Sequence, residues 1–299
     1  MRQAAERPAA VLPSVTNLSD QPAIKIATTR EEQLKQSVDE AVKSLCDKLN
    51  RGYTQDFMEA LTFYSKLWTY SAQNQFLIRI QRPDASHVAG YGRWKRLGRQ
   101  VMKGAQGIWI WAPMLATREQ DNGEKVKVLV GFRPTCVFAA EDLVDFEDNP
   151  LPGLWPTLPD DVNPLYSSVV DKLTAQGIKV AEVDLPGTAQ GMCNATGIYI
   201  RKGVDSRNRL AILFHELAHH LAHVGTNDDK STQQRELEAE GSAHIVLHHF
   251  GIEHEASANY LTNWQATPVT LIASLGTINR IVKQIVRLVE GESESEVAS

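Results

Sequence analysis

A histidine-rich helix near residue 215 sets narrow limits on how this chain folds. Residues 215–219 read His-Glu-Leu-Ala-His, an H-E-x-x-H pattern. Apolar residues recur around it at helical spacing: Leu210, Leu213, Phe214, Leu217 and Leu221. Residues four apart lie on one face of a helix, so the imidazoles of His215 and His219 can bind one metal ion. The sequence therefore predicts a buried metal-binding helix, whereas a helix that carries these histidines without a metal is the alternative interpretation.

The glutamate inside this pattern predicts hydrolytic chemistry. Glu216 lies about 100° around the helix from His215, beside the place where a water on the ion would lie. A carboxylate there can accept a proton from water and return it to a leaving amine. We therefore expect Glu216 to be the catalytic acid–base of a metallopeptidase, with Zn²⁺ as the metal and another divalent ion such as Mn²⁺ as the alternative.

A second helix offers the third ligand. Ser231 and Gln234 predict a capped helix start, and acidic residues follow at 236, 238 and 240. Glu236 and Glu240 share one face, whereas Glu238 points elsewhere and is expected to be solvated. We assign Glu236 to the metal and Glu240 to the orientation of a ligand histidine, although spacing alone leaves the reverse assignment open.

Composition excludes several classes of protein. The three cysteines (Cys46, Cys136 and Cys193) are far apart, which excludes a disulfide framework and suits a reducing compartment. No apolar run is long enough to span a bilayer, and the N-terminus does not resemble a secretory signal. We therefore expect a cytoplasmic protein without a membrane partner. A net charge of −5 limits any nucleic-acid site to a local patch.

The order of the patterns predicts an α+β protein with two domains. Residues 134–170 contain seven acids, six prolines and no Lys or Arg, a composition typical of a linker. The expected parts are a disordered N-terminus (1–28), a DNA-binding domain (29–140), a linker (141–163), a peptidase domain (164–290) and an acidic tail (291–299).

Periodicity predicts the elements of both domains. Helices are expected from Thr28 or Thr29, and over 54–80, 164–176, 206–223, 232–249 and 268–289. Strands are expected at 107–111, 126–130, 179–184 and 197–201.

A basic, aromatic segment precedes the linker. From Arg79 to Lys103 there are seven basic residues and one acid, Asp84, which gives a local charge of +6. Cations neutralise phosphates and aromatic faces stack on unpaired bases, so this composition favours single-stranded DNA. The candidate contacts are Arg93, Trp94, Lys95, Arg96, Arg99 and Lys103. The alternative interpretation is a solvated positive face with its tryptophans in the core.

Extended stretches of the chain resemble known families. Asn74–Ile78, Gln81–Ala85, Val88–Tyr91 and neighbouring motifs resemble the N-terminal domain of ArdC-like antirestriction proteins over about residues 53–140. This resemblance implies single-stranded-DNA binding and protection of mobile-element DNA, such as a conjugating plasmid, from restriction in a bacterial cytoplasm.

The C-terminal half resembles zincin metallopeptidases of the ImmA/IrrE and ArdC-like families. The resemblance rests on a strand, the H-E-x-x-H helix and a following helix with E-x-E-A-E. It implies that Gly197–Ile200 is an edge strand that pairs with extended substrate, whereas an ordinary strand of the sheet is the alternative interpretation. Glu240 stands where the ImmA/IrrE pattern has Asn or a similar polar residue.

Three functions follow as hypotheses. The first is a DNA-binding zinc peptidase with an unknown protein substrate. The second is a DNA-binding module whose zinc site is not catalytic. The third is a regulatory protease that cleaves a repressor, as ImmA-like proteins do.

Overall fold

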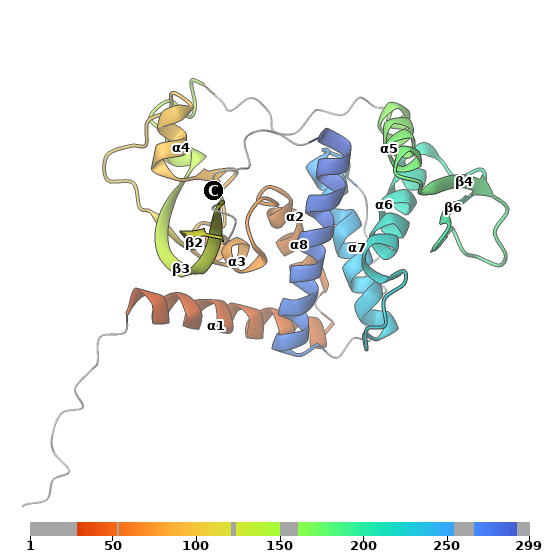
Figure 1. The fold of residues 1–299 in the computed structure, drawn as a ribbon, viewed down its shortest axis with the longest axis horizontal. Helices are drawn as coiled ribbons and strands as arrows, with labels where there is room; N and C mark the ends of the chain where they lie inside the picture. Colours follow the sequence, from red (N-terminus) through yellow and green to blue (C-terminus); the bar gives the residue numbers. More distant parts are fainter. Residues whose placement is uncertain (1–28, 53, 121–123, 150–160, 254–265, 292–299) are drawn as a thin grey trace, which may run out of the picture.

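The computed structural model describes residues 29–52, 54–120, 124–149, 161–253 and 266–291 of the 299-residue chain. Its fold is mixed α+β, with one small sheet at each end and helices between them (Figure 1). The expected disorder at 1–28 and the acidic tail from 292 onward lie outside the described residues.

Both halves of the chain share one hydrophobic core. Buried residues from the predicted DNA-binding domain, such as Leu61 and Leu77, belong to the same cluster as Phe214 and Ile278 of the predicted peptidase domain. Helix α2 (Thr54–Ser65) lies directly against α7 (Thr232–His249). The two halves are therefore packed together and do not form two separate cores.

The N-terminal half begins with the expected helix. Helix α1 (Arg30–Asn50) starts at a capping box in which the Thr29 hydroxyl accepts from the Glu32 amide and the Glu32 carboxylate accepts from the Thr29 amide. Its buried face includes Leu34, Val38 and Val42, as the periodicity predicts.

The single helix expected over 54–80 is instead two helices, α2 and α3 (Ala72–Gln81). The Ser71 hydroxyl caps α3 by accepting from the Asn74 amide, and the Gln75 side chain donates to the carbonyl of Leu67 at 2.9 Å. Apolar residues continue at helical spacing through the break, because Leu67 of the intervening turn is buried and Trp68 and Tyr70 pack against the core. Periodicity alone therefore missed it.

The first sheet has the order β1-β3-β2 and is antiparallel. Its strands are β1 (Val88–Ala89), β2 (Ile108–Glu119) and β3 (Lys125–Ala139), so both predicted strands of the hairpin are confirmed and are longer than expected. Side-chain amides of α3 bind the outer edge of β2. Asn74 pairs with the backbone N–H and C=O of Trp111, and Gln81 pairs in the same way with Trp109. These hydrogen bonds satisfy backbone N–H and C=O groups at the edge of β2 that have no partner strand.

The segment expected to be a linker begins as part of this half. After α4 (Tyr91–Arg96) and the short helix η1 (Ala140–Asp142), Leu143 is buried in a small apolar cluster. Asp142 binds Arg82 at 2.8 Å. The acids at 141–149 therefore include partners for buried basic residues. Residues 150–160 lie outside the described residues.

The second sheet has the order β4-β6-β5 and corrects one expectation. Strand β6 (Gly197–Arg201), expected at an edge, lies in the centre between the parallel β4 (Lys179–Val183) and the antiparallel β5 (Gly191–Asn194). The edge strand beside α6 (Ser206–His223) is therefore β5, which the sequence analysis did not predict.

The remaining helices match their predicted bounds closely. Helix α5 (Asn163–Ala175) packs on α8 (Pro268–Glu290), and α8 also contacts α7 and α1. Among the described residues, α8 alone has the length and apolar composition of a membrane-spanning helix. Its residues Leu271, Leu275, Ile278 and Ile285 are buried in the shared core.

Candidate metal centre

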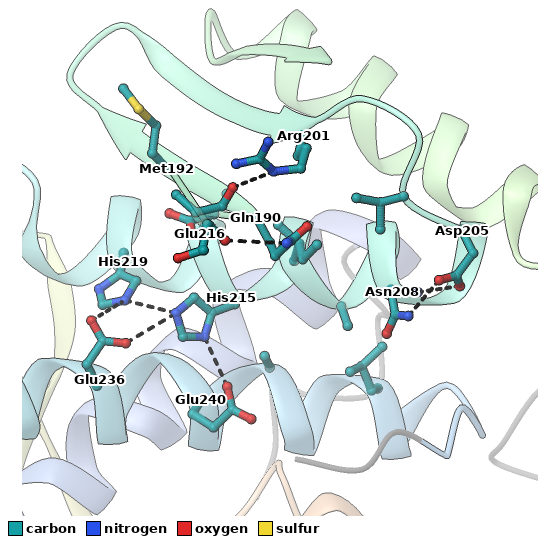
Figure 2. Close-up of a pocket in the computed structure, with 18 of the residues that line it drawn as sticks. Gln190, Met192, Arg201, Asp205, Asn208, His215, Glu216, His219, Glu236 and Glu240 are labelled. Atoms are coloured by element: carbon teal, nitrogen blue, oxygen red, sulfur yellow. Dashed lines mark hydrogen bonds and ion pairs between the residues drawn. The ribbon is translucent and has the colours of Figure 1, made fainter. Parts of the chain in front are cut away.

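The predicted metal ligands meet between two antiparallel helices. Asp205 caps α6 by accepting from the Asn208 amide, and Ser231 caps α7 by accepting from the Gln234 amide. The apolar stripes of both helices lie in the core, so their polar faces meet at one end of a cleft of about 870 Å³. This packing places His215 and His219 opposite Glu236 (Figure 2).

The three ligand atoms form a compact triangle. The Nε2 atoms of His215 and His219 are 3.1 Å apart, and each is 3.4 Å from a carboxylate oxygen of Glu236. Ligand atoms on a tetrahedral ion at about 2.0–2.2 Å stand roughly 3.3–3.6 Å apart. The triangle therefore has the size that a single divalent ion requires, and all three side chains are half-buried.

Glu240 contacts the opposite nitrogen of one histidine. Its Oε2 lies 3.1 Å from Nδ1 of His215, while Nε2 of the same ring faces Glu236. A carboxylate that accepts from Nδ1–H keeps the Nε2 lone pair available for a metal. The geometry thus favours Glu236 as the ligand and Glu240 as the residue that orients His215.

The electrostatics of the triangle demand a positive charge. Burial by itself lowers the pKa of His215, but hydrogen bonds to Glu236 and Glu240 outweigh this effect and raise the pKa to about 10. Hydrogen bonds from His215 and His219 hold the pKa of Glu236 well below its usual range. Without a metal, a proton on the His215 imidazole supplies positive charge at the place where a divalent ion would supply it.

Glu216 lies beside the triangle and beneath strand β5. It is 9% exposed, and burial raises the pKa of its carboxyl group. A Cβ atom on Gly191 would stand 2.7 Å from Oε1 of Glu216 and 2.6 Å from Ile212, so only glycine fits at this point of β5. Burial and the neighbouring Glu216 raise the pKa of the Cys193 thiol to about 12.

Local sequence patterns did not predict the residues of β5 that form the wall of this cleft. Gly191 and Met192 line it together with Arg201 from β6. A four-residue strand is too short for periodicity to identify. The turn after it does have a signal, because the Asn194 carboxamide oxygen accepts from the Thr196 amide, as Asn often does in turns.

The expectation of a solvated Glu238 is wrong. This side chain is 0% exposed, and its Oε2 lies 2.7 Å from Nζ of Lys230 and 3.5 Å from Nε2 of His223. Helix α7 is enclosed by α6, α8 and α2. Glu238 is therefore buried although it does not share a face with Glu236 and Glu240. Glu238 therefore ties α7 to the preceding loop and to α6.

Two of the six candidate DNA contacts are buried. Trp94 is 3% exposed and its indole N–H donates to the carbonyl of Phe138 at 3.0 Å. Arg99 is 7% exposed and binds Asp145 at 3.0 Å. Neither can contact DNA in this structure. The remaining four candidates are exposed: Arg93, Lys95, Arg96 and Lys103.

A stability measurement tests the new assignment of Trp94. Because its ring fills the small core beneath α4, Trp94→Ala is expected to lower the free energy of unfolding by about 3–5 kcal/mol. Urea denaturation of wild type and variant measures the difference. A surface tryptophan would instead change stability by less than about 0.5 kcal/mol, and that result would contradict its burial.

A known protein family matches the N-terminal part of the chain and not the part that contains the metal centre. The model of the N-terminal domain of the anti-restriction factor ArdC matches residues 29–138. Residues 29–138 belong to the family of ArdC N-terminal domains. The match covers the half that contains α1 to β3 and stops before the metal centre.

Solved structures and a curated relative extend the comparison beyond this domain. The crystal structure of metal-free antirestriction ArdC from plasmid R388 covers 85% of the chain and 99% of its own, with a TM-score of 0.50 at 16% identity. The Mn(II)-bound structure of the same protein covers 87% and 99%, with a TM-score of 0.49 at 16% identity. An uncharacterized protein of Bacillus anthracis is 24% identical, and the aligned region covers 80% of this chain and 48% of the relative. The chain thus spans about half the length of that relative.

Proposed function

We propose that this ArdC-like protein binds single-stranded DNA through its N-terminal half and hydrolyses a protein substrate at a divalent metal ion in its C-terminal half. The observation that carries the hydrolytic part is the triangle formed by His215, His219 and Glu236 beside the buried Glu216. By analogy with the antirestriction protein of plasmid R388, the biological role is protection of incoming mobile-element DNA from restriction in a bacterial cytoplasm.

The donor set determines the expected metal. Two imidazole nitrogens and one carboxylate oxygen suit Zn²⁺, and Mn²⁺ is the alternative because it also accepts carboxylate ligands. When bound, the ion would polarise a scissile carbonyl and acidify water in the open part of the cleft.

The chain's own residues would supply orientation and proton transfer. Glu240 orients the His215 ring through a contact to Nδ1. Gly191 of β5 packs directly against the Glu216 side chain. The raised pKa of Glu216 suits a group that accepts a proton from water and returns it to a leaving amine. Strand β5, rather than the central β6, has the free edge on which an extended peptide could pair.

A DNA-binding module with a non-catalytic metal site is the second candidate. The open cleft and the glutamate beside the ligands favour catalysis, because a structural zinc site usually has four protein ligands. A regulatory protease of the ImmA type would use the same centre on a single protein target, with little dependence on DNA.

Metal loading tests the core of the proposal. After chelation and dialysis, wild type is expected to take up one Zn²⁺ or Mn²⁺ per chain in a calorimetric titration, and His215→Ala is expected to lose this site. His220→Ala is the matched control, since His220 lies on the same helix and contacts the carbonyl of Asn194. Folded wild-type protein that binds neither ion would overturn the hydrolytic proposal.

A further inference from the structure

A groove in the N-terminal half differs in chemistry from the metal cleft. It has a volume of about 1030 Å³ and lies between α1, α4, the start of α3 and the β2–β3 hairpin. These elements occupy the same end of the molecule, away from α6 and β6 (Figure 1). None of the lining residues belongs to the metal centre.

One wall of the groove is aromatic and held in place. Trp111 and Pro113 alternate along β2 and so share a face, and Phe132 stands directly opposite Pro113 in the strand register. The Phe132 ring is 55% exposed although it is large and apolar. The backbone of Trp111 is bound on both sides by Asn74. The wall is therefore a preorganised apolar surface that is open to solvent.

The opposite rim carries two exposed arginines. Arg93 and Arg96 are three residues apart on α4 and so lie on one side of it. The buried Trp94 anchors the other side of α4 to β3 through the Phe138 carbonyl. Within the described part of the chain, no acidic side chain forms an ion pair with either arginine. Both guanidinium groups therefore remain available for anions.

The third side of the groove is acidic. Glu31 and Asp39 line it from α1 together with Lys35, which binds Glu31 at 3.1 Å and lies 5.9 Å from the centroid of the Trp111 ring. The net charge of these three side chains is negative, so phosphates favour the arginines, and a nucleic-acid backbone would follow α4 and direct its bases toward Phe132. Bases in a duplex are already stacked on each other, which makes an unpaired strand the ligand that such a wall accepts.

From these observations, and resting on the proposed DNA-binding function, we infer that this groove is the binding site for single-stranded DNA. Phosphates bind Arg93 and Arg96, and unpaired bases stack on the exposed ring of Phe132. The site differs from the one that the sequence indicated, because Trp94 supports the arginines from behind and makes no contact with the bases.

Fluorescence anisotropy with a labelled oligo-dT strand tests the groove. Phe132→Ala is expected to weaken binding about 5- to 150-fold, the effect of losing one stacked base, without a change in the salt dependence. Phe132→Tyr retains a ring and is expected to keep wild-type affinity. Phe132 is exposed, so the substitution is not expected to unfold the chain, and circular dichroism checks this.

The double variant Arg93→Gln/Arg96→Gln tests the phosphate contacts. It is expected to reduce the slope of log K against log salt by about 1.4, from roughly 0.7 per phosphate contact to a single strand. Lys95→Gln/Lys103→Gln is the matched control, since it removes the same charge from exposed residues that do not line the groove. It is expected to change the slope by less than half as much.

The outcomes separate the groove from the function. If wild type binds oligo-dT and the two groove variants bind equally well, or if the lysine control has the larger effect, the groove assignment is overturned while DNA binding stands. Equal affinity of wild type for oligo-dT and for a duplex would also overturn it. If wild type does not bind oligo-dT at low salt, the DNA-binding function itself fails, and the groove with it.

Discussion

Glu216→Gln is expected to lower the rate of peptide hydrolysis by about 10²- to 10⁴-fold while the chain keeps its metal. Glutamine preserves the size of the side chain but cannot accept a proton from water. Glu216 is outside the ligand triangle, so metal content should stay at the wild-type level. Hydrolysis is measured by mass spectrometry on a peptide library, and metal content by elemental analysis of the same samples.

Two further variants sharpen this result. Glu59→Gln makes the same chemical change at an exposed position of α2 and should leave turnover unchanged. Gly191→Ala should lower turnover without altering the carboxylate itself, because the added Cβ displaces Glu216. If Glu216→Gln hydrolyses peptides as fast as wild type, Glu216 is not the acid–base. If wild type and Glu216→Gln protect DNA from restriction equally well, the DNA-binding module with a non-catalytic metal site is favoured.

Glu236→Ala is expected to weaken metal binding more than Glu240→Ala. Loss of Glu236 removes two carboxylate oxygens, each of which lies 3.4 Å from the Nε2 atom of one ligand histidine. Loss of Glu240 removes only the contact to Nδ1 of His215. Removal of such an orienting carboxylate typically costs about 10- to 100-fold in affinity. Competition with a chelating fluorophore measures both variants under the same conditions.

The order of the two effects decides the assignment. A larger loss for Glu240→Ala would place Glu240 on the metal, which is the alternative that the spacing in the sequence leaves open. Equal and small losses would indicate that the acids of α7 do not contact a metal. Glu253→Ala provides the control, because this exposed glutamate follows α7 and does not line the cleft.

Local features of the sequence predicted a large part of this protein. Helices α5 to α8 start and end within a residue or two of their expected bounds, because caps and 3.6-residue periodicity depend only on neighbouring residues. The pairing of His215 with His219 has the same origin, since their separation is set by a single turn of one helix. The basic composition of the segment around α4 was equally visible.

Tertiary contacts decided what local patterns could not. Ser71 caps a new helix, and Gln75 donates to the carbonyl of Leu67 in the turn that interrupts the predicted long helix. Strand β5 is defined by its pairing with β6 rather than by its own four residues. Burial likewise separates Trp94 from the exposed Phe132, although composition alone favours the tryptophan for stacking.

The sequence by itself thus determined the helices and the two histidines on one of them, because those relations extend over only a few residues. The tertiary structure decided which glutamate faces the imidazoles, which strand forms the free edge and which aromatic ring remains exposed. Each of these depends on segments that are distant in the chain, and packing energy, rather than any local preference, brings them together.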